Sequence, residues 1–251
     1  MKIAILTGAS AGLGTEIYKA LQSEVLDEIW IIARRAEKLQ ALADTFGKIQ
    51  TKVLPLDLTA SDAIHSYATA LKENNPDVVY LFNNAGMGIL GNLDEANPEA
   101  QAHMIDLNVR ALTSITTHTL PYMKEGAKII NTCSIASFVP NARMTVYSAT
   151  KAFVMSFSRS LRYELKKRKI NVTAVCPGPM STEFLDVAGI EKGASHTFDW
   201  LPRCNVEKTA KGGIRAAKKG RGVYTPHPFY KFYRILAKLT PHALLMPFSK
   251  T

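Results

Sequence analysis

Two residues in the middle of the chain have the types and the spacing that proton transfer to a carbonyl oxygen requires. Tyr147 and Lys151 lie four positions apart in a segment of helical period, so their side chains share one helix face, about 5–6 Å apart at Cβ. An ammonium about 4 Å from a phenolate, at an effective dielectric of about 20, stabilises it by about 4 kcal/mol, and desolvation offsets part of this. We therefore expect Lys151 to lower the pKa of Tyr147 and Tyr147 to donate or accept the proton.

The same spacing occurs again at Tyr163 and Lys167, among charged neighbours typical of a solvated helix face. Tyr147 differs, because it follows an expected strand end at Ser134 and a loop through Pro140. This context favours Tyr147 as the reactive residue. Ser134 is a candidate for holding the substrate oxygen, although a strand-end hydroxyl can equally bond the backbone.

A glycine-rich loop follows the first apolar run of the chain. It reads Thr7-Gly8-Ala9-Ser10-Ala11-Gly12-Leu13-Gly14 and opens directly into a segment of helical period. Glycines permit a tight turn and let the backbone approach a pyrophosphate, whose charge is favoured by free N–H groups and the helix dipole. The loop therefore predicts a nucleotide site, although an ordinary strand-to-helix turn is the alternative.

Short apolar runs alternate with helical segments along most of the chain. The apolar runs lie at 3–6, 29–32, 53–54, 78–82, 128–130 and 172–175, and the helical segments at 12–23, 35–46, 60–73, 98–123 and 146–168. A further helix near 206–219 and a strand at 222–225 would add a seventh strand. This alternation predicts one doubly wound α/β domain of the Rossmann type, a seven-stranded parallel sheet flanked by helices on both faces.

The residue after the second strand bears on the choice of cofactor. An acid there would accept the ribose hydroxyls of NAD, but the position is Ala33, followed by Arg34 and Arg35. A guanidinium suits a phosphate dianion by bidentate hydrogen bonding, so we expect NADP(H), with Arg34 as the first contact. The alternative is that both arginines merely begin a solvated helix.

Six motifs in order resemble the short-chain dehydrogenase/reductase family, in its form of about 250 residues, from Lys2 to about Thr225. They are the glycine-rich loop, Asn83-Asn84-Ala85-Gly86, Asn108, Ser134, Tyr147-x-x-x-Lys151 and Pro177-Gly178-Pro179-Met180-Ser181-Thr182. The resemblance implies that Asn108, Ser134, Tyr147 and Lys151 are catalytic, with Asn108 holding a water that relays protons through Lys151.

The resemblance also assigns residues to the cofactor. It implies that 83–86 lines the adenine side, that Asp57 contacts adenine, that Lys151 binds the nicotinamide ribose and that 177–182 wraps the nicotinamide. The full expected set is Gly8, Ser10, Ala11, Gly12, Leu13, Gly14, Arg34, Arg35, Asp57, Leu58, Asn84, Ala85, Gly86, Tyr147, Lys151, Pro177, Gly178 and Thr182.

The segment between 182 and 205 lacks strong periodicity, and in the family the corresponding segment closes over the substrate. Its apolar residues are candidates for a lid: Phe184, Leu185, Val187, Ile190, Phe198, Trp200 and Leu201. Phe138, Val139 and Met144 would supply the facing wall, although part of this set could simply pack against the body. We expect an apolar ketone or aldehyde, or the matching alcohol, as the substrate.

Composition excludes several other classes of protein. With 47% hydrophobic residues the chain can bury a substantial core, and no apolar stretch approaches the roughly 20 residues of a membrane-spanning helix. Nothing near the amino terminus is typical of a signal peptide, so a cytoplasmic location is expected. Cys133, Cys176 and Cys204 lack the number and spacing of a disulfide framework or a zinc site, and we expect reduced thiols and no metal.

The net charge of +10 comes entirely from the end of the chain. Residues 1–202 are neutral, whereas residues 203–251 carry 11 basic residues and the single acid Glu207. We expect an NADP-binding catalytic domain over residues 1–225 and a basic amphipathic extension over residues 226–251, whose apolar residues recur at helical spacing. The extension could lie on a membrane surface, fold onto the body or contact a second subunit of a homo-oligomer. Nucleic-acid binding is not expected, since no recognition motif accompanies the charge.

These observations predict an NADP(H)-dependent oxidoreductase that moves a hydride between nicotinamide and a carbonyl or alcohol. Within enzymes, the alternative is a β-ketoacyl-acyl-carrier-protein reductase, whose acidic carrier a basic surface could attract. The alternative outside the enzymes is a non-catalytic NADP-binding sensor or scaffold. The presence of all four catalytic candidates argues against a sensor.

Overall fold

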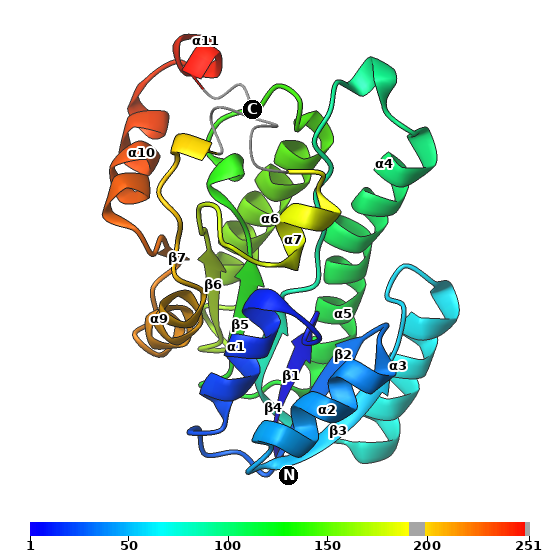
Figure 1. Cartoon of the computed structure of the whole chain (residues 1–251). Helices are drawn as coiled ribbons and strands as arrows, with labels where there is room; N and C mark the ends of the chain where they lie inside the picture. The colour runs from blue at the N-terminus through cyan, green and yellow to red at the C-terminus, as the bar shows by residue number, and fades with distance from the viewer. Residues whose placement is uncertain (191–198, 249–251) are drawn as a thin grey trace.

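The apolar runs of the sequence form the strands of one parallel sheet (Figure 1). The computed structural model describes residues 1–190 and 199–248. Its strands are β1 (Lys2–Thr7), β2 (Glu28–Ala33), β3 (Gln50–Pro55), β4 (Asp77–Asn83), β5 (Lys128–Thr132), β6 (Asn171–Val175) and β7 (Val223–Tyr224). They lie in the order β3-β2-β1-β4-β5-β6-β7, and every neighbouring pair is parallel. The predicted fold class is confirmed.

Helices cover both faces of the sheet, which explains why the central strands are apolar on both sides. One face is covered by α1 (Gly12–Leu21), α2 (Ala36–Phe46) and α9 (Val206–Lys218). The other is covered by α3 (Ser61–Asn74), α5 (Leu112–Thr119) and α6 (Thr145–Glu164). Residues of β1 alternate between the two cores: Ile3 and Ile5 pack with the second set of helices, Ala4 and Leu6 with the first.

The strand order fixes where a ligand can bind. The chain moves outward from β1 through β2 to β3, then returns to place β4 on the other side of β1. The loops after β1 and β4 therefore leave in opposite directions, and a crevice opens at the carboxyl ends of these strands. The glycine-rich loop follows β1, and the Asn83-Asn84-Ala85-Gly86 segment begins at the end of β4.

The helix expected over 98–123 is present but is not uniform. It consists of α4 (Pro98–Ile105), a π-helical segment (Asp106–Ala111), α5 and a short 3₁₀ turn (Leu120–Tyr122). A π-helical segment carries an extra residue in its turn and is often found at functional sites. The helix expected over 146–168 ends earlier, at Glu164, and Lys169 beyond it has a left-handed backbone with φ of 53°.

The end of the chain forms two further helices, α10 (Pro228–Leu239) and α11 (His242–Leu245), on the side of the molecule that holds α9 (Figure 1). Tyr230 and Ala237 of α10 are buried, and the ring of Tyr233 lies 6.1 Å from that of Phe138. One side of α10 is thus folded onto the body of the protein.

Candidate active site

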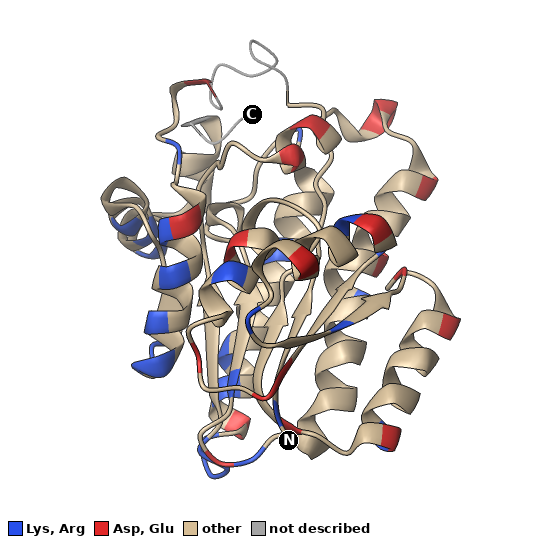
Figure 2. Ribbon diagram, turned by 60° about the horizontal axis from the view of Figure 1, so that its bottom comes forward, with Lys and Arg blue, Asp and Glu red and all other residues tan. Residues whose placement is uncertain are grey.

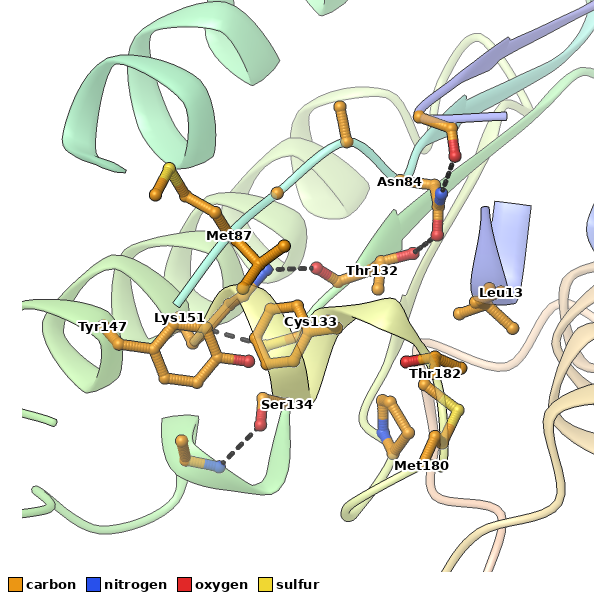
Figure 3. A pocket seen from close by; sticks show the side chains of 18 of the residues that line it. Leu13, Asn84, Met87, Thr132, Cys133, Ser134, Tyr147, Lys151, Met180 and Thr182 are labelled. Carbon is orange, nitrogen blue, oxygen red and sulfur yellow. Dashed lines mark hydrogen bonds between the residues drawn. The ribbon is translucent and has the colours of Figure 1, made fainter. Parts of the chain in front are cut away.

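A cavity of about 1100 Å³ lies at the carboxyl ends of the strands. Its walls come from the loops after β1, β2, β3, β4, β5 and β6, together with α6, α10 and the short helix α7 (Glu183–Val187). Figure 3 shows that side chains from β5, α6 and the segment after β6 point into the same space. This is the crevice that the strand order creates.

The glycine-rich loop has the geometry of a phosphate cradle. Gly8 and Gly12 have φ of +69° and +53°, values that residues with a side chain rarely adopt. A Cβ on Gly14 would lie 2.0 Å from the Gly8 carbonyl oxygen, so α1 can approach the loop only because the residue is glycine. The loop therefore lets a pyrophosphate lie against backbone N–H groups at the start of α1. The residues present fit a dinucleotide.

Hydrogen bonds tie the glycine-rich loop to the neighbouring strands. The Oγ1 of Thr7 accepts bonds from the backbone N–H groups of Asn84 (2.9 Å) and Ala85 (3.0 Å). The Asn84 side chain donates to the carbonyls of Thr7 and Gly8, both at 3.1 Å, and accepts from Thr132 Oγ1 at 3.1 Å (Figure 3). Asn84 thus joins the ends of β1, β4 and β5 and fixes the floor of the cavity.

The side chains of Tyr147, Ser134 and Lys151 point to one region of the cavity (Figure 3). Tyr147 lies in the first turn of α6, is 8% exposed, and directs its hydroxyl toward Ser134 at the end of β5. The Oγ of Ser134 accepts a bond from Ala136 N at 3.1 Å, which orients the hydroxyl at the start of a 3₁₀ turn. A carbonyl oxygen placed between Ser134 and Tyr147 would meet two hydroxyl groups.

The sequence predicted that Lys151 lowers the pKa of Tyr147, but in the structure the pKa of Tyr147 is raised. Burial raises the pKa of the Tyr147 phenol, and the hydrogen bond with Ser134 offsets only part of that rise. The Lys151 Nζ lies 5.7 Å from the centre of the Tyr147 ring and donates to the Thr132 carbonyl at 3.0 Å. Burial also lowers the pKa of Lys151. The expectation counted the attraction between the two groups but gave too little weight to the desolvation of the phenolate.

Asn108 is buried within the π-helical segment and contacts the strand-end loop rather than the cavity. Its Nδ2 donates to the Met87 carbonyl (2.8 Å) and to Thr150 Oγ1 (3.1 Å), and its Oδ1 accepts from Met87 N (2.9 Å). A Cβ on Gly86 would lie 3.0 Å from Asn108 Oδ1 and 3.4 Å from Lys151 Nζ, so Gly86 lets these groups approach. Asn108 therefore joins the π-helical segment, the loop after β4 and α6 beside Lys151.

Positive charge gathers where β2 ends. Arg34 lines the cavity near Asp57. Burial alone would raise the pKa of Asp57, but hydrogen bonds from Thr59, and to a smaller extent the charge of Arg34, hold it below its ordinary value. Arg35 donates to Ser10 Oγ at 3.1 Å and pairs with a carboxylate oxygen of Glu183 at 2.8 Å. Lys38 pairs with the other oxygen of Glu183, also at 2.8 Å. Glu183 thus bridges the segment after β6 to the basic start of α2.

The cavity brings together nearly all of the residues expected at the site. Of the predicted cofactor and catalytic residues, only Gly14 and Asn108 do not line it, and both contact residues that do. Among the expected lid residues, Phe184, Leu185, Val187, Trp200 and Leu201 line the cavity and Ile190 is buried; Phe198 lies outside the described residues.

The expected facing wall is only partly correct. Met144 lines the cavity, but Phe138 and Val139 do not. They are buried instead in a cluster that includes Ala237 of α10 and is packed against by Tyr233. The C-terminal helix therefore covers the apolar residues that were expected to face a substrate.

A protein-family model described as short chain dehydrogenase matches residues 2–191. The chain belongs to the short-chain dehydrogenase/reductase family. Sulfoacetaldehyde reductase of Chromohalobacter salexigens is 35% identical over 187 residues, which cover 71% of this chain and 72% of that protein. Five of the six motifs that carry the resemblance in the sequence line the cavity, and the sixth, Asn108, contacts Met87, which lines it.

Two solved structures of the family share the fold over almost the whole chain. A short-chain dehydrogenase from Sphingobium yanoikuyae in complex with NADPH has a TM-score of 0.79 and 27% identity, covering 94% of this chain and 92% of its own. A family member from Burkholderia phymatum in complex with NAD has a TM-score of 0.82 and 22% identity, with the same coverage. The present protein is thus an oxidoreductase of this family, acting on an alcohol or carbonyl group with a nicotinamide cofactor.

Sequence reasoning missed the part of the site that comes from the end of the chain. Phe229, Tyr230, Tyr233, Leu236 and Leu245 line the cavity. The apolar spacing of α10 signalled that the helix had a buried side, but not which surface would receive it. Lys38 and Glu183 were also missed, because their pairing joins segments far apart in the chain.

Among residues 1–190 and 199–248, no group of three or more His, Cys, Asp or Glu side chains is placed to hold a metal ion. Within the same ranges no helix has the length and apolar character needed to cross a membrane. Cys133, Cys176 and Cys204 are free, as the sequence predicted, and all three are buried.

Proposed function

We propose that this protein reduces an apolar ketone or aldehyde with NADPH, or oxidises the matching alcohol with NADP⁺. The observation that carries the proposal is the convergence of the Tyr147 hydroxyl, the Ser134 hydroxyl and the Lys151 ammonium on one cavity that begins at a glycine cradle. A bound nicotinamide would supply the hydride that is exchanged with the substrate carbon.

Each residue has a separate task at the substrate oxygen. Ser134 donates a hydrogen bond that holds the oxygen in place. Tyr147 transfers the proton, because its raised pKa keeps the phenol protonated at neutral pH and ready to donate. Lys151 would contact the ribose of a bound cofactor, and it keeps a positive charge beside Tyr147 when the phenol loses its proton. Asn108 holds the backbone of Met87 and so positions the loop after β4 beside the reactive residues.

The preference for NADP(H) rests on charge. Arg34, Arg35 and Lys38 lie at or just beyond the end of β2. Position 33 is an alanine, so no carboxylate there can accept hydrogen bonds from the ribose hydroxyls of NAD. A 2′-phosphate would meet at least two of these cations, whereas NAD would leave them without a phosphate partner.

The apolar substrate is supported by the far wall of the cavity. Phe184 packs against the Tyr147 ring with ring centres 5.8 Å apart, and Met144, Tyr233 and Leu236 extend the apolar surface away from the reactive hydroxyl. A substrate carrying several charges would find few partners there. An aliphatic or aromatic chain next to the carbonyl would be buried.

The test is turnover of NADPH with a panel of carbonyl compounds. The unmodified protein should oxidise NADPH with apolar ketones or aldehydes, and Tyr147→Phe should lose about 10²–10⁴-fold in kcat, the usual contribution of general acid catalysis, while still binding NADPH. Tyr163→Phe is the matched control, because it removes the tyrosine hydroxyl of the other Tyr-x-x-x-Lys pair. Tyr163 is 82% exposed. Retained activity in Tyr147→Phe would refute the mechanism. Binding of NADPH without turnover of any carbonyl would favour a sensor.

A further inference from the structure

One side of α10 is apolar and uncovered. Phe232, Ile235 and Leu239 follow one another at helical spacing and are 66%, 55% and 77% exposed. At 3.6 residues per turn they form one continuous strip along the helix, which we call the exposed strip. A contiguous exposed apolar surface of this kind usually marks an interaction site.

The exposed strip does not result from a helix that is loosely attached. On the opposite side of α10, Tyr230 is fully buried and its hydroxyl donates to the Pro202 carbonyl at 2.7 Å. Ala237, on the same side of the helix as Tyr230, is 6% exposed. The helix is therefore anchored to the body by one side, and it holds the exposed strip in a fixed orientation.

On one edge, the exposed strip adjoins the cavity. Phe229 and Leu236 occupy the helix side between the strip and the buried residues, and both line the cavity. Trp200 continues this apolar rim: its side chain is 76% exposed, and its ring centre lies 6.0 Å from that of Phe229. The apolar surface thus runs without interruption from the outside of α10 to the wall of the cavity.

On the other edge, the exposed strip is flanked by positive charge. Lys231, Arg234 and Lys238 lie along that side of α10. They belong to residues 203–251, which hold 11 basic residues and only Glu207 as an acid. Figure 2 shows this concentration on α9 and α10, whereas α3 and α4 on the far side of the molecule carry most of their charge as acid.

We propose that the exposed strip docks on an anionic lipid surface, with Lys231 and Lys238 at the phosphate headgroups and Phe232 and Leu239 among the acyl chains. A basic amphipathic helix with aromatic residues has the chemistry of such an interface. A second copy of the chain fits less well, because a two-fold contact through this strip would bring the same lysines of both copies together.

Docking in this way sets the rim of the cavity, Phe229, Leu236 and Trp200, at the lipid surface. If the proposed function holds, the substrate class is then an apolar carbonyl or alcohol that partitions into membranes and enters the cavity across this rim. The docking itself does not depend on the proposed function. It can be measured without cofactor or substrate.

The first experiment is co-sedimentation of the full-length protein with vesicles. Binding should occur with mixed phosphatidylglycerol and phosphatidylcholine vesicles at low salt, and should fall steeply with added salt or with phosphatidylcholine alone. Tryptophan emission should shift to shorter wavelength on binding. The shift reports on Trp200, because Trp30 is fully buried in the core. Absence of sedimentation with anionic vesicles at low salt would overturn the proposal.

A pair of variants separates insertion of the strip from simple charge attraction. Phe232→Glu should lower the vesicle partition coefficient about tenfold or more, since it places a charge among the acyl chains. Tyr163→Glu is the matched control: it adds the same charge at an exposed aromatic of a helix in a basic neighbourhood, on α6, and should bind as the unmodified protein does. Circular dichroism checks the fold of both variants.

Two further outcomes would overturn the proposal. Equal binding of Phe232→Glu and the unmodified protein would mean that the strip does not enter the lipid. A change from dimer to monomer on Phe232→Glu, without vesicle binding by either form, would make the strip a subunit contact. Neither outcome bears on NADPH turnover, so failure of the docking proposal and failure of the proposed function can be told apart.

Discussion

The ring of Tyr230 occupies the space that a side chain at position 178 would need. An ideal Cβ on Gly178 would lie 2.1 Å from Cε2 of Tyr230, and this tyrosine is fully buried. Gly178 belongs to the segment after β6 that lines the cavity, and Tyr230 belongs to α10. The C-terminal helix and the cavity wall are therefore packed together, and a change in one must move the other.

The contact between these two residues can be tested by a double-mutant cycle. Gly178→Ala should lower the free energy of unfolding by about 1–3 kcal/mol, the usual cost of overpacking, and weaken NADPH binding. Tyr230→Ala should cost about 3–5 kcal/mol, because it empties a buried aromatic site. In the double variant the alanine at 178 no longer meets a ring, so in urea unfolding its cost should be smaller than the sum of the two single-variant costs. Additive costs would show that the ring and Gly178 are independent.

A second prediction concerns Asn108. Asn108→Ala leaves both the N–H and the carbonyl of Met87 without their side-chain partner, and each such loss costs about 1–3 kcal/mol when the group is buried. Urea unfolding should therefore show a drop of at least about 1 kcal/mol, and kcat should fall because the same amide also donates to Thr150, the residue before Lys151 on α6. Asn92→Ala, an exposed asparagine in the loop before α4, is the control and should change neither quantity. A fully stable, fully active Asn108→Ala would contradict the positioning role.

Much of the site could be predicted from the sequence because it is built from local motifs at strand ends. The glycine-rich loop and the Asn83-Asn84-Ala85-Gly86 segment each follow a strand directly. A parallel sheet gathers such strand ends at one edge, so the order of the strands and helices already brings them together.

The rest of the site depends on packing between distant segments, which periodicity does not encode. Glu183 meets Arg35 because the segment after β6 folds back over the start of α2. Tyr230 meets Gly178 because α10 turns back onto the cavity. The pKa of Tyr147 was predicted in the wrong direction for a related reason: the spacing to Lys151 is visible in the sequence, but the depth of burial is a property of the whole fold.

The ion pairs of Glu183 predict how the cofactor competes for the basic cluster. Its carboxylate pairs with both Arg35 and Lys38, with all three side chains about half exposed, so a 2′-phosphate would compete with it for these cations. Glu183→Gln should therefore tighten NADPH binding by up to about fivefold, the scale of an exposed ion pair, and leave NADH binding nearly unchanged. Fluorescence titration of both cofactors measures this.

Glu16→Gln is the control for that substitution. It breaks a comparable ion pair, Glu16 with Lys19 at 2.8 Å, that lies outside the cavity lining, and it should leave the binding of both cofactors unchanged. Weaker NADPH binding in Glu183→Gln would show instead that the carboxylate orders Arg35 and Lys38 for the phosphate.

The raised pKa of Tyr147 predicts different pH profiles for the two directions of the reaction. Carbonyl reduction needs the phenol, which burial keeps protonated, so its kcat should stay nearly constant between about pH 6 and 9. Alcohol oxidation needs the phenolate, and below the pKa its population grows tenfold per pH unit, so kcat should rise by up to about that factor per unit over the same range. One ketone and its alcohol, measured in both directions in the same buffers, provide the comparison. An oxidation rate that is already constant at neutral pH would mean that Lys151 and the bound cofactor lower the pKa of Tyr147 enough to reverse the effect of burial.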